Sequence, residues 1–145
     1  MIGNSVIKLQ DVSVYQQQHL ILSKVNLTVH EGEFVFLIGQ TGSGKSSLLK
    51  LLYGDVHIQK GTGEVVGFNL NKLSDSETPY LRRKLGIVFQ DFQLLTDRTV
   101  EKNLEFVMRA TGWVDQILIT ERIHKVLDQV GLRSKLKKMP HEISG

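Results

Sequence analysis

The chain has 145 residues, of which 41% are apolar and 23% are charged, and its formal net charge is +3. This length and composition fit one soluble domain with a sheet covered by helices. The sequence has no basic stripe interleaved with aromatic residues, so nucleic-acid binding is not predicted. The absence of cysteine excludes disulfides and thiol chemistry, and no signal-peptide pattern or apolar stretch of roughly 20 residues predicts secretion or a membrane span.

Two antiparallel strands are predicted at the N-terminus. Apolar and polar residues alternate over residues 6–14 and again over residues 21–29, which is the pattern of strands with one buried face. The polar residues 15–19 between them predict a turn. Residues 30–33 predict a second turn, in which Gly32 can adopt a positive φ.

The pattern then changes to that of a parallel sheet. Residues 34–39 (FVFLIG) are apolar without alternation, which predicts a strand buried on both faces of such a sheet. Residues 63–68 (GEVVGF) and 85–90 (LGIVFQ) predict two further short strands. These strands alternate with helices, so the predicted fold class is α/β.

Four helices are predicted in the same part of the chain. Residues 46–54 have apolar residues at helical spacing and end on a glycine, and residues 78–84 begin with Thr-Pro, which suits a first helical turn. Apolar residues three to four positions apart also predict helices over residues 99–111 and 119–132. The C-terminal part is therefore predicted to be mainly helical.

A phosphate-binding loop is predicted between the apolar strand and the first helix. Residues 39–46 (GQTGSGKS) fit the pattern G-x-x-x-x-G-K-[ST], in which glycines let the backbone N–H groups surround an anion at a helix N-terminus. Lys45 is placed to contact the β- and γ-phosphates, and the Ser46 hydroxyl is placed to ligate Mg²⁺. We expect nucleotide contacts from the whole loop, namely Gly39, Gln40, Thr41, Gly42, Ser43, Gly44, Lys45, Ser46 and Ser47.

The loop alone leaves the reaction open, because nucleotide kinases, GTPases and transport ATPases share it, but its flanks resemble the ATP-binding cassette (ABC) family. LSKVNLTVHEGEFVFLIGQTGSGKSSLLKLLYG is similar to that family's approach to the phosphate loop, LRRKLGIVFQD to its Q-loop, and the final ISG to the start of its signature motif. The resemblance covers essentially the whole chain. It implies an incomplete ABC nucleotide-binding domain of the P-loop NTPase class, with an antiparallel β subdomain (1–33), a partial RecA-like parallel core (34–91) and the start of a helical subdomain (92–145).

The resemblance also implies roles for particular residues around ATP and Mg²⁺. Tyr15 would stack on adenine, although an exposed turn tyrosine is the alternative. Gln90 would be the catalytic Q-loop glutamine that contacts Mg²⁺ and the attacking water, and Lys45 would act in catalysis as well as in binding. Ser144 and Gly145 would contact the γ-phosphate held by a second protomer.

The same resemblance places several catalytic groups beyond the signature motif. They are the aspartate that holds Mg²⁺, the glutamate that polarises the attacking water and a switch histidine. Because phosphoryl transfer to water depends on several such groups acting together, we expect this chain to bind ATP without appreciable hydrolysis. We also expect it to be a fragment of a longer protein or to self-associate through an apolar sheet edge.

Residues 79–106 are most similar to the cell-division ATPases of the family. This likeness implies an ATP-hydrolysing homodimer in the cytoplasm, on the inner face of the cell membrane. An integral membrane partner would make the only membrane contact and would dock near residues 92–95, for which core packing is the alternative. Lipoprotein-releasing or macrolide-exporting ATPases, a nucleotide kinase and a non-catalytic nucleotide-binding module are the other possible functions.

Overall fold

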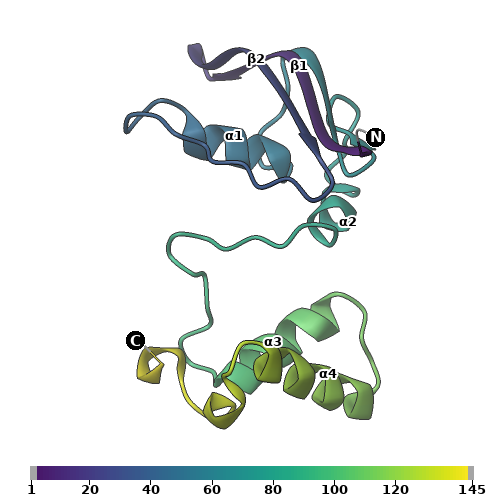
Figure 1. Cartoon of the computed structure of the whole chain (residues 1–145), viewed down its shortest axis with the longest axis vertical. Coiled ribbons are helices and arrows are strands. Elements are labelled where there is room, and N and C mark those ends of the chain that lie inside the picture. The colour runs from purple at the N-terminus through teal and green to yellow at the C-terminus, as the bar shows by residue number, and fades with distance from the viewer. Residues whose placement is uncertain (1–2, 144–145) are drawn as a thin grey trace. The chain divides into compact units, whose positions relative to one another are not determined.

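The computed structural model describes residues 3–143, and the chain forms two compact units. The first ends at Gly86, and the second begins at Ile87. The first unit contains all the strands of the described residues together with helices α1 and α2, and the second contains helices α3 and α4 (Figure 1).

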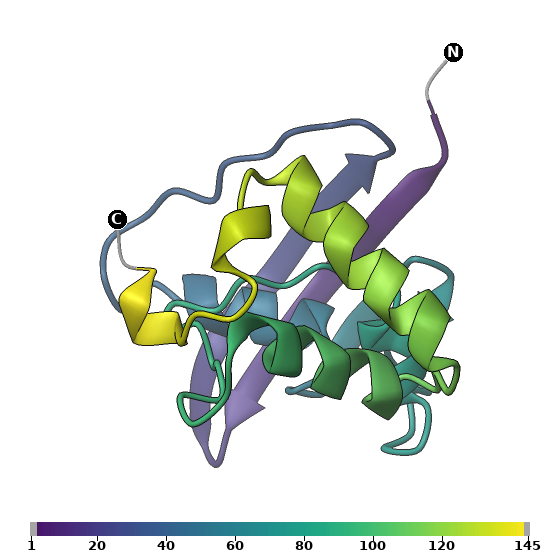
Figure 2. The same ribbon diagram turned by 90° about the horizontal axis from the view of Figure 1, so that it is seen from below.

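The first unit is built on a sheet of four antiparallel strands in the order β2-β1-β3-β4. Two long strands, β1 and β2, run side by side and are joined by a tight turn (Figure 2). The N-terminal strand pair predicted from the alternating pattern is thus confirmed, with strands longer than predicted. The strands are β1 (Ser5–Gln16), β2 (His19–His30), β3 (Lys60–Val65) and β4 (Phe68–Asn69).

The segment predicted as one strand over residues 63–68 is divided into β3 and β4. Val66 has a φ of 43° and Gly67 a φ of 83°, so the chain reverses direction between Val65 and its partner Phe68. Two consecutive residues with positive φ are typical of the tight turns that join antiparallel strands. The prediction of a single strand was wrong because the valine preceding Gly67 adopts a conformation that its apolar side chain does not reveal.

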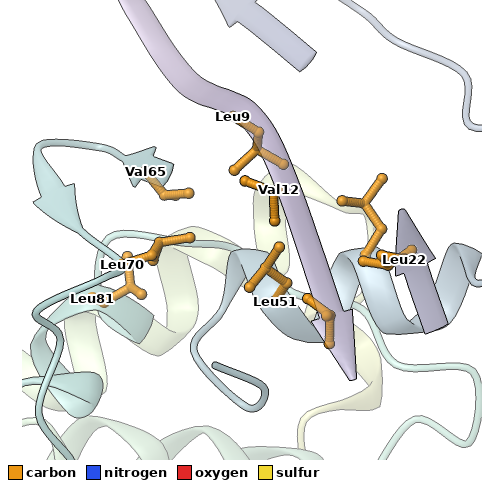
Figure 3. Packing of buried hydrophobic residues seen from close by; sticks show 9 residues of the cluster. Leu9, Val12, Leu22, Leu51, Val65, Leu70 and Leu81 are labelled. Atoms are coloured by element: carbon orange, nitrogen blue, oxygen red, sulfur yellow. The ribbon is translucent and has the colours of Figure 1, made fainter. Parts of the chain in front are cut away.

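Helices α1 (Lys45–Leu52) and α2 (Thr78–Arg82) pack against the sheet and match the helices predicted there. Of the α1 leucines, Leu48 and Leu51 are buried, whereas Leu49 is half exposed, as expected from a spacing of three residues. Leu9 and Val12 of β1 point toward Leu51 in the buried cluster (Figure 3). Each such fully buried aliphatic side chain stabilises the fold by about 1.5–3 kcal/mol.

Two predicted core strands, over residues 34–39 and 85–90, are not strands in the described structure. The apolar side chains of residues 34–38 are largely exposed, with exposed fractions of 83% for Phe34 and 88% for Ile38. In residues 85–90, Val88 is 89% exposed, and the other apolar side chains are partly buried. A strand needs a neighbour that pairs with its backbone N–H and C=O groups, and within residues 3–143 all strand pairing is among β1–β4. The apolar pattern predicted burial in a parallel sheet. This burial is not observed because, within residues 3–143, no strand pairs with either segment.

The second unit is a pair of helices followed by short 3₁₀ turns. Ile119, Ile123 and Leu127 are buried on one face of α4, where apolar residues of α3 pack against them. Both predicted helices are confirmed, although α4 begins earlier because the Asp115 carboxylate caps it. The elements are α3 (Val100–Ala110), α4 (Gln116–Gln129), η1 (Arg133–Lys135) and η2 (Pro140–Glu142).

Residues 92–95, predicted to begin the helical subdomain, form a loop before α3. Phe92 is 69% exposed and Leu94 is 52% exposed, so core packing does not account for these two side chains. Docking of a membrane partner at this loop remains a prediction.

Asn103 of α3 fixes the backbone that leads into the helix. Its Oδ1 accepts a hydrogen bond from the Leu95 N–H at 2.8 Å, and its Nδ2 donates to the carbonyl oxygens of Leu95 at 2.9 Å and of Arg98 and Thr99 at 3.1 Å. An alanine there removes the bond at Oδ1 and the bonds of both Nδ2 hydrogens, which are shared among three carbonyl oxygens. We expect Asn103→Ala to lower the free energy of unfolding of the second unit by about 2–3 kcal/mol.

Urea denaturation followed by the fluorescence of Trp113, which lies in this unit, measures the effect. Lys125→Ala, at an exposed position of α4, is the matched control and should change stability by less than about 0.5 kcal/mol. Equal midpoints for the two variants would show that the Asn103 hydrogen bonds do not stabilise this unit.

Candidate nucleotide-binding site

The glycine-rich loop adopts a backbone that requires glycine at two positions. Gly42 has a φ of 82°, and Gly44, which precedes α1, has a φ of 88°. A Cβ atom on Gly44 would lie 2.9 Å from Leu22 Cδ2 and 3.0 Å from the Ile21 carbonyl oxygen. The start of α1 can therefore lie this close to β2 only because position 44 has no side chain.

Lys45 reaches back across this loop. Its Nζ donates hydrogen bonds to the carbonyl oxygens of Gly39 at 2.8 Å and Gln40 at 2.7 Å, and it lies 3.5 Å from Ser43 Oγ. These contacts hold a positive charge inside the curve of the loop. A phosphate group could replace the carbonyl oxygens as a stronger, charged acceptor.

The N-terminus of α1 adds further attraction for an anion. The first N–H groups of an α-helix have no acceptor within the helix, and the helix dipole gives this end a partial positive charge. Helix α1 has no side-chain N-cap and no acidic residue in its first turn. Nothing in that turn therefore competes with a bound phosphate for these N–H groups.

A groove of about 420 Å³ brings Tyr15 together with the start of α1. Tyr15 lies near the end of β1, whereas Ser46 and Ser47 lie in the first turn of α1, yet all three line the same groove. The structure thus unites the residue predicted to stack on adenine with the serine predicted to ligate Mg²⁺. Such a pairing of an aromatic wall with hydroxyl groups suits a ligand that has both a flat ring and oxygen-rich groups.

Within the first unit, residues 39–45 of the phosphate loop do not line this groove. Residues 39–43 are exposed on the loop. Gln90 lies in an exposed turn of the second unit, and its contact with Mg²⁺ and the attacking water remains a prediction. Ser144 and Gly145 lie outside the described residues.

One further wall of the groove, besides Tyr15 and the start of α1, was not predicted from the sequence. It is formed by the segment between α1 and β3, from which Asp55, His57 and Gln59 line the groove. Asp55 Oδ2 lies 3.9 Å from Lys50 Nζ. The pKa of the neighbouring Tyr53 is raised, first by burial of its hydroxyl and then by the negative charge of Asp55. No motif marks this segment, because its path depends on where α1 ends and where β3 pairs with β1.

Comparison with known proteins identifies the family. A family model described as ABC transporter matches residues 22–145. The chain belongs to the ABC transporter family. This finding confirms the resemblance seen in the phosphate loop, the Q-loop segment and the final ISG.

Several curated ABC relatives are similar over most of the chain. The cell division ATP-binding protein FtsE of Streptococcus pneumoniae serotype 2 is 40% identical over 97% of this chain, and FtsE of Escherichia coli K12 is 39% identical over 86%. The methionine import ATP-binding protein MetN of Rhizobium johnstonii is 35% identical over 99%. The chain spans 61%, 55% and 39% of these relatives, respectively.

Solved structures confirm the predicted ABC nucleotide-binding fold. A dimeric structure of the bacterial ABC transporter cassette MJ0796 matches with a TM-score of 0.81 and 31% identity, covering 96% of this chain and 63% of that one. A post-hydrolysis dimer of MJ0796 bound to ADP and Pi matches with a TM-score of 0.79 and 30% identity, covering 95% and 63%. In the part of this chain that the structure describes, every helix is too short or too polar to cross a bilayer.

Proposed function

We propose that this chain is an ATP-binding module that holds MgATP in the groove between Tyr15 and the start of α1. The observation that carries the proposal is the convergence of Tyr15, Ser46 and Ser47 on one groove at the end of a phosphate loop that contains Lys45. Membership of the ABC transporter family supports the same ligand.

The groove and the adjoining phosphate loop would divide the recognition of ATP between them. The Tyr15 ring offers a flat apolar face to the adenine, and the Lys45 ammonium and the N–H groups at the start of α1 attract the phosphates. The Ser46 hydroxyl is a hard oxygen donor of the kind that Mg²⁺ prefers, so the residues present fit the metal. The Mg²⁺ would neutralise part of the triphosphate charge.

The whole protein would be an FtsE-type ATPase in cell division. Similarity to FtsE relatives over most of the chain supports this proposal, and similarity to dimeric MJ0796 cassettes supports a homodimer. The partner would be an FtsX-like integral membrane protein, which would recruit the ATPase to the inner face of the cell membrane. Gln90 and residues 92–95 would connect nucleotide state to that partner.

The 145-residue chain itself would bind ATP without appreciable turnover. The acidic residues that hold Mg²⁺ and polarise water in the family are expected beyond the signature motif. Steady phosphate release from MgATP by the purified chain, lost on Lys45→Ala, would contradict this part of the proposal.

Nucleotide binding is tested by comparing MgATP with magnesium tripolyphosphate, which has the phosphates but no base. We expect Tyr15→Ala to weaken MgATP binding about 10-fold, because stacking of a base on an aromatic side chain contributes about 1–3 kcal/mol. Tripolyphosphate binding should not change. Isothermal titration calorimetry provides both dissociation constants.

Tyr80→Ala is the matched control, because Tyr80 is an exposed tyrosine of α2 outside the groove. It should leave both dissociation constants unchanged. If Tyr15→Ala binds MgATP as tightly as the unaltered chain, the base does not stack on Tyr15 and the proposed orientation of the nucleotide is wrong.

A further inference from the structure

The backbone around Tyr15 leaves the regular pairing of the sheet. Pairing between β1 and β3 ends at Ser13 and Lys60, so β3 supplies no backbone partner at Tyr15. Pairing between β1 and β2 is also irregular here, with a shift in register between Val14 and Tyr15. The direction of the Tyr15 side chain is therefore not determined by a continuous strand ladder.

Gln59 supplies the missing contact through its side chain. Its Oε1 accepts a hydrogen bond from the Tyr15 N–H at 2.8 Å, while its own N–H donates to the Ser13 carbonyl oxygen at 3.2 Å. Gln59 thus contacts β1 at two points, separated by one residue. Two contacts on either side of Val14 restrict the rotation of the backbone that carries the Tyr15 ring.

Lys60, the next residue, approaches the ring itself. Its Nζ lies 6.0 Å from the centroid of the Tyr15 ring, at the outer limit of a cation–π contact. An ammonium over one face of the ring favours a single ring orientation. The opposite face would then be the one offered to a base.

We propose that Gln59 and Lys60 are positioning residues that hold the Tyr15 ring in the orientation required to stack on the nucleobase. The inference rests on the proposed function, because it concerns the base end of the same groove. Neither residue need touch the phosphates or the metal. Their effect on ATP binding would act through Tyr15, so it should depend on both the base and the tyrosine ring.

Gln59→Leu tests the proposal, because leucine removes the acceptor oxygen without emptying the position. In the 145-residue chain we expect MgATP to bind about 5-fold more weakly, while magnesium tripolyphosphate binds unchanged. Gln59→Glu keeps a carboxylate oxygen where the amide oxygen was and should restore the ratio of the two affinities. Lys60→Met should weaken MgATP binding about 2-fold.

A double-mutant cycle separates positioning from general support of the sheet. In a Tyr15→Ala background, Gln59→Leu should have no further effect on MgATP binding, because there is no ring left to position. Equal weakening of MgATP and tripolyphosphate, or an effect of Gln59→Leu that persists without the ring, would overturn the proposal. So would Gln59→Leu and Lys60→Met variants that both bind MgATP normally.

The same measurements distinguish failure of this inference from failure of the proposed function. If Tyr15→Ala weakens MgATP selectively but Gln59→Leu and Lys60→Met do not, only the positioning role is lost. If the unaltered chain does not prefer MgATP to tripolyphosphate, the base-binding groove itself is wrong. Far-UV circular dichroism of each variant checks that β1–β3 remain folded.

Discussion

Replacing Lys45 with alanine is expected to weaken MgATP binding at least about 100-fold, because a charge-assisted hydrogen bond to phosphate contributes about 1.5–3 kcal/mol and this ammonium can make more than one. Its Nζ already lies within 2.8 Å of two carbonyl oxygens on the inside of the loop. A phosphate there would take over this cation. Equilibrium binding at constant ionic strength measures the effect.

The loop itself should survive the Lys45→Ala substitution. The substitution removes the two hydrogen bonds from Lys45 Nζ to loop carbonyl oxygens, but it leaves the positive φ angles of Gly42 and Gly44 and the hydrogen bond from the Ser43 N–H to the Gln40 carbonyl oxygen. The loss would therefore report on the ligand and not on folding.

Lys72→Ala is the matched control, because it removes one exposed lysine from the same unit outside the groove. Its effect on the dissociation constant should be less than about 2-fold, since only screened, long-range attraction is lost. If Lys45→Ala and Lys72→Ala bind MgATP equally well, the phosphates do not lie in the loop.

Features that depend on local sequence were predicted well. Alternation predicted β1 and β2, helical spacing predicted α1, α3 and α4, and the turn after β2 predicted the positive φ that Gly32 adopts. Each of these depends on residues within one element or its immediate neighbours. The same local pattern also placed Lys45 and Ser46 at the start of a helix.

Features that depend on distant partners were not predicted. The apolar residues 34–39 have the composition of a buried strand, but composition does not provide the neighbouring strand that would pair with them. The groove wall at residues 55–59 likewise depends on the pairing of β3 with β1. Neither Gln59 nor Asn103 has any motif, since their roles consist of hydrogen bonds to backbone groups that the sequence does not display.

Replacement of Gly61 in β3 is predicted to have the largest effect on the stability of the first unit. Gly61 has a φ of 86°, and a Cβ atom there would lie 2.4 Å from the Gln10 carbonyl oxygen and 2.5 Å from the Asp11 carbonyl group. These are backbone atoms of the irregular part of β1. Asn26 of β2 contacts the same irregular part of β1 from the other side, since its Oδ1 accepts a hydrogen bond from the Asp11 N–H at 3.0 Å.

Because β1 is thus held from both sides, it cannot move away from a methyl group at position 61. We expect Gly61→Ala to lower the free energy of unfolding of the first unit by at least about 3 kcal/mol, combining backbone strain of about 1–2 kcal/mol with the clash. Amide hydrogen exchange of β1 and β3 measures this directly. Fluorescence of Trp113 would not, because that residue lies in the second unit.

Gly67→Ala separates the two contributions. Gly67 has nearly the same φ, 83°, but a Cβ atom there meets nothing within 4 Å. This variant should therefore show only the strain of about 1–2 kcal/mol. If both alanines lower protection equally, contact between Gly61 and the β1 backbone is unimportant. If only Gly61→Ala lowers hydrogen-exchange protection strongly, and it also weakens MgATP binding, the close approach of β3 to β1 maintains the strand that carries Tyr15.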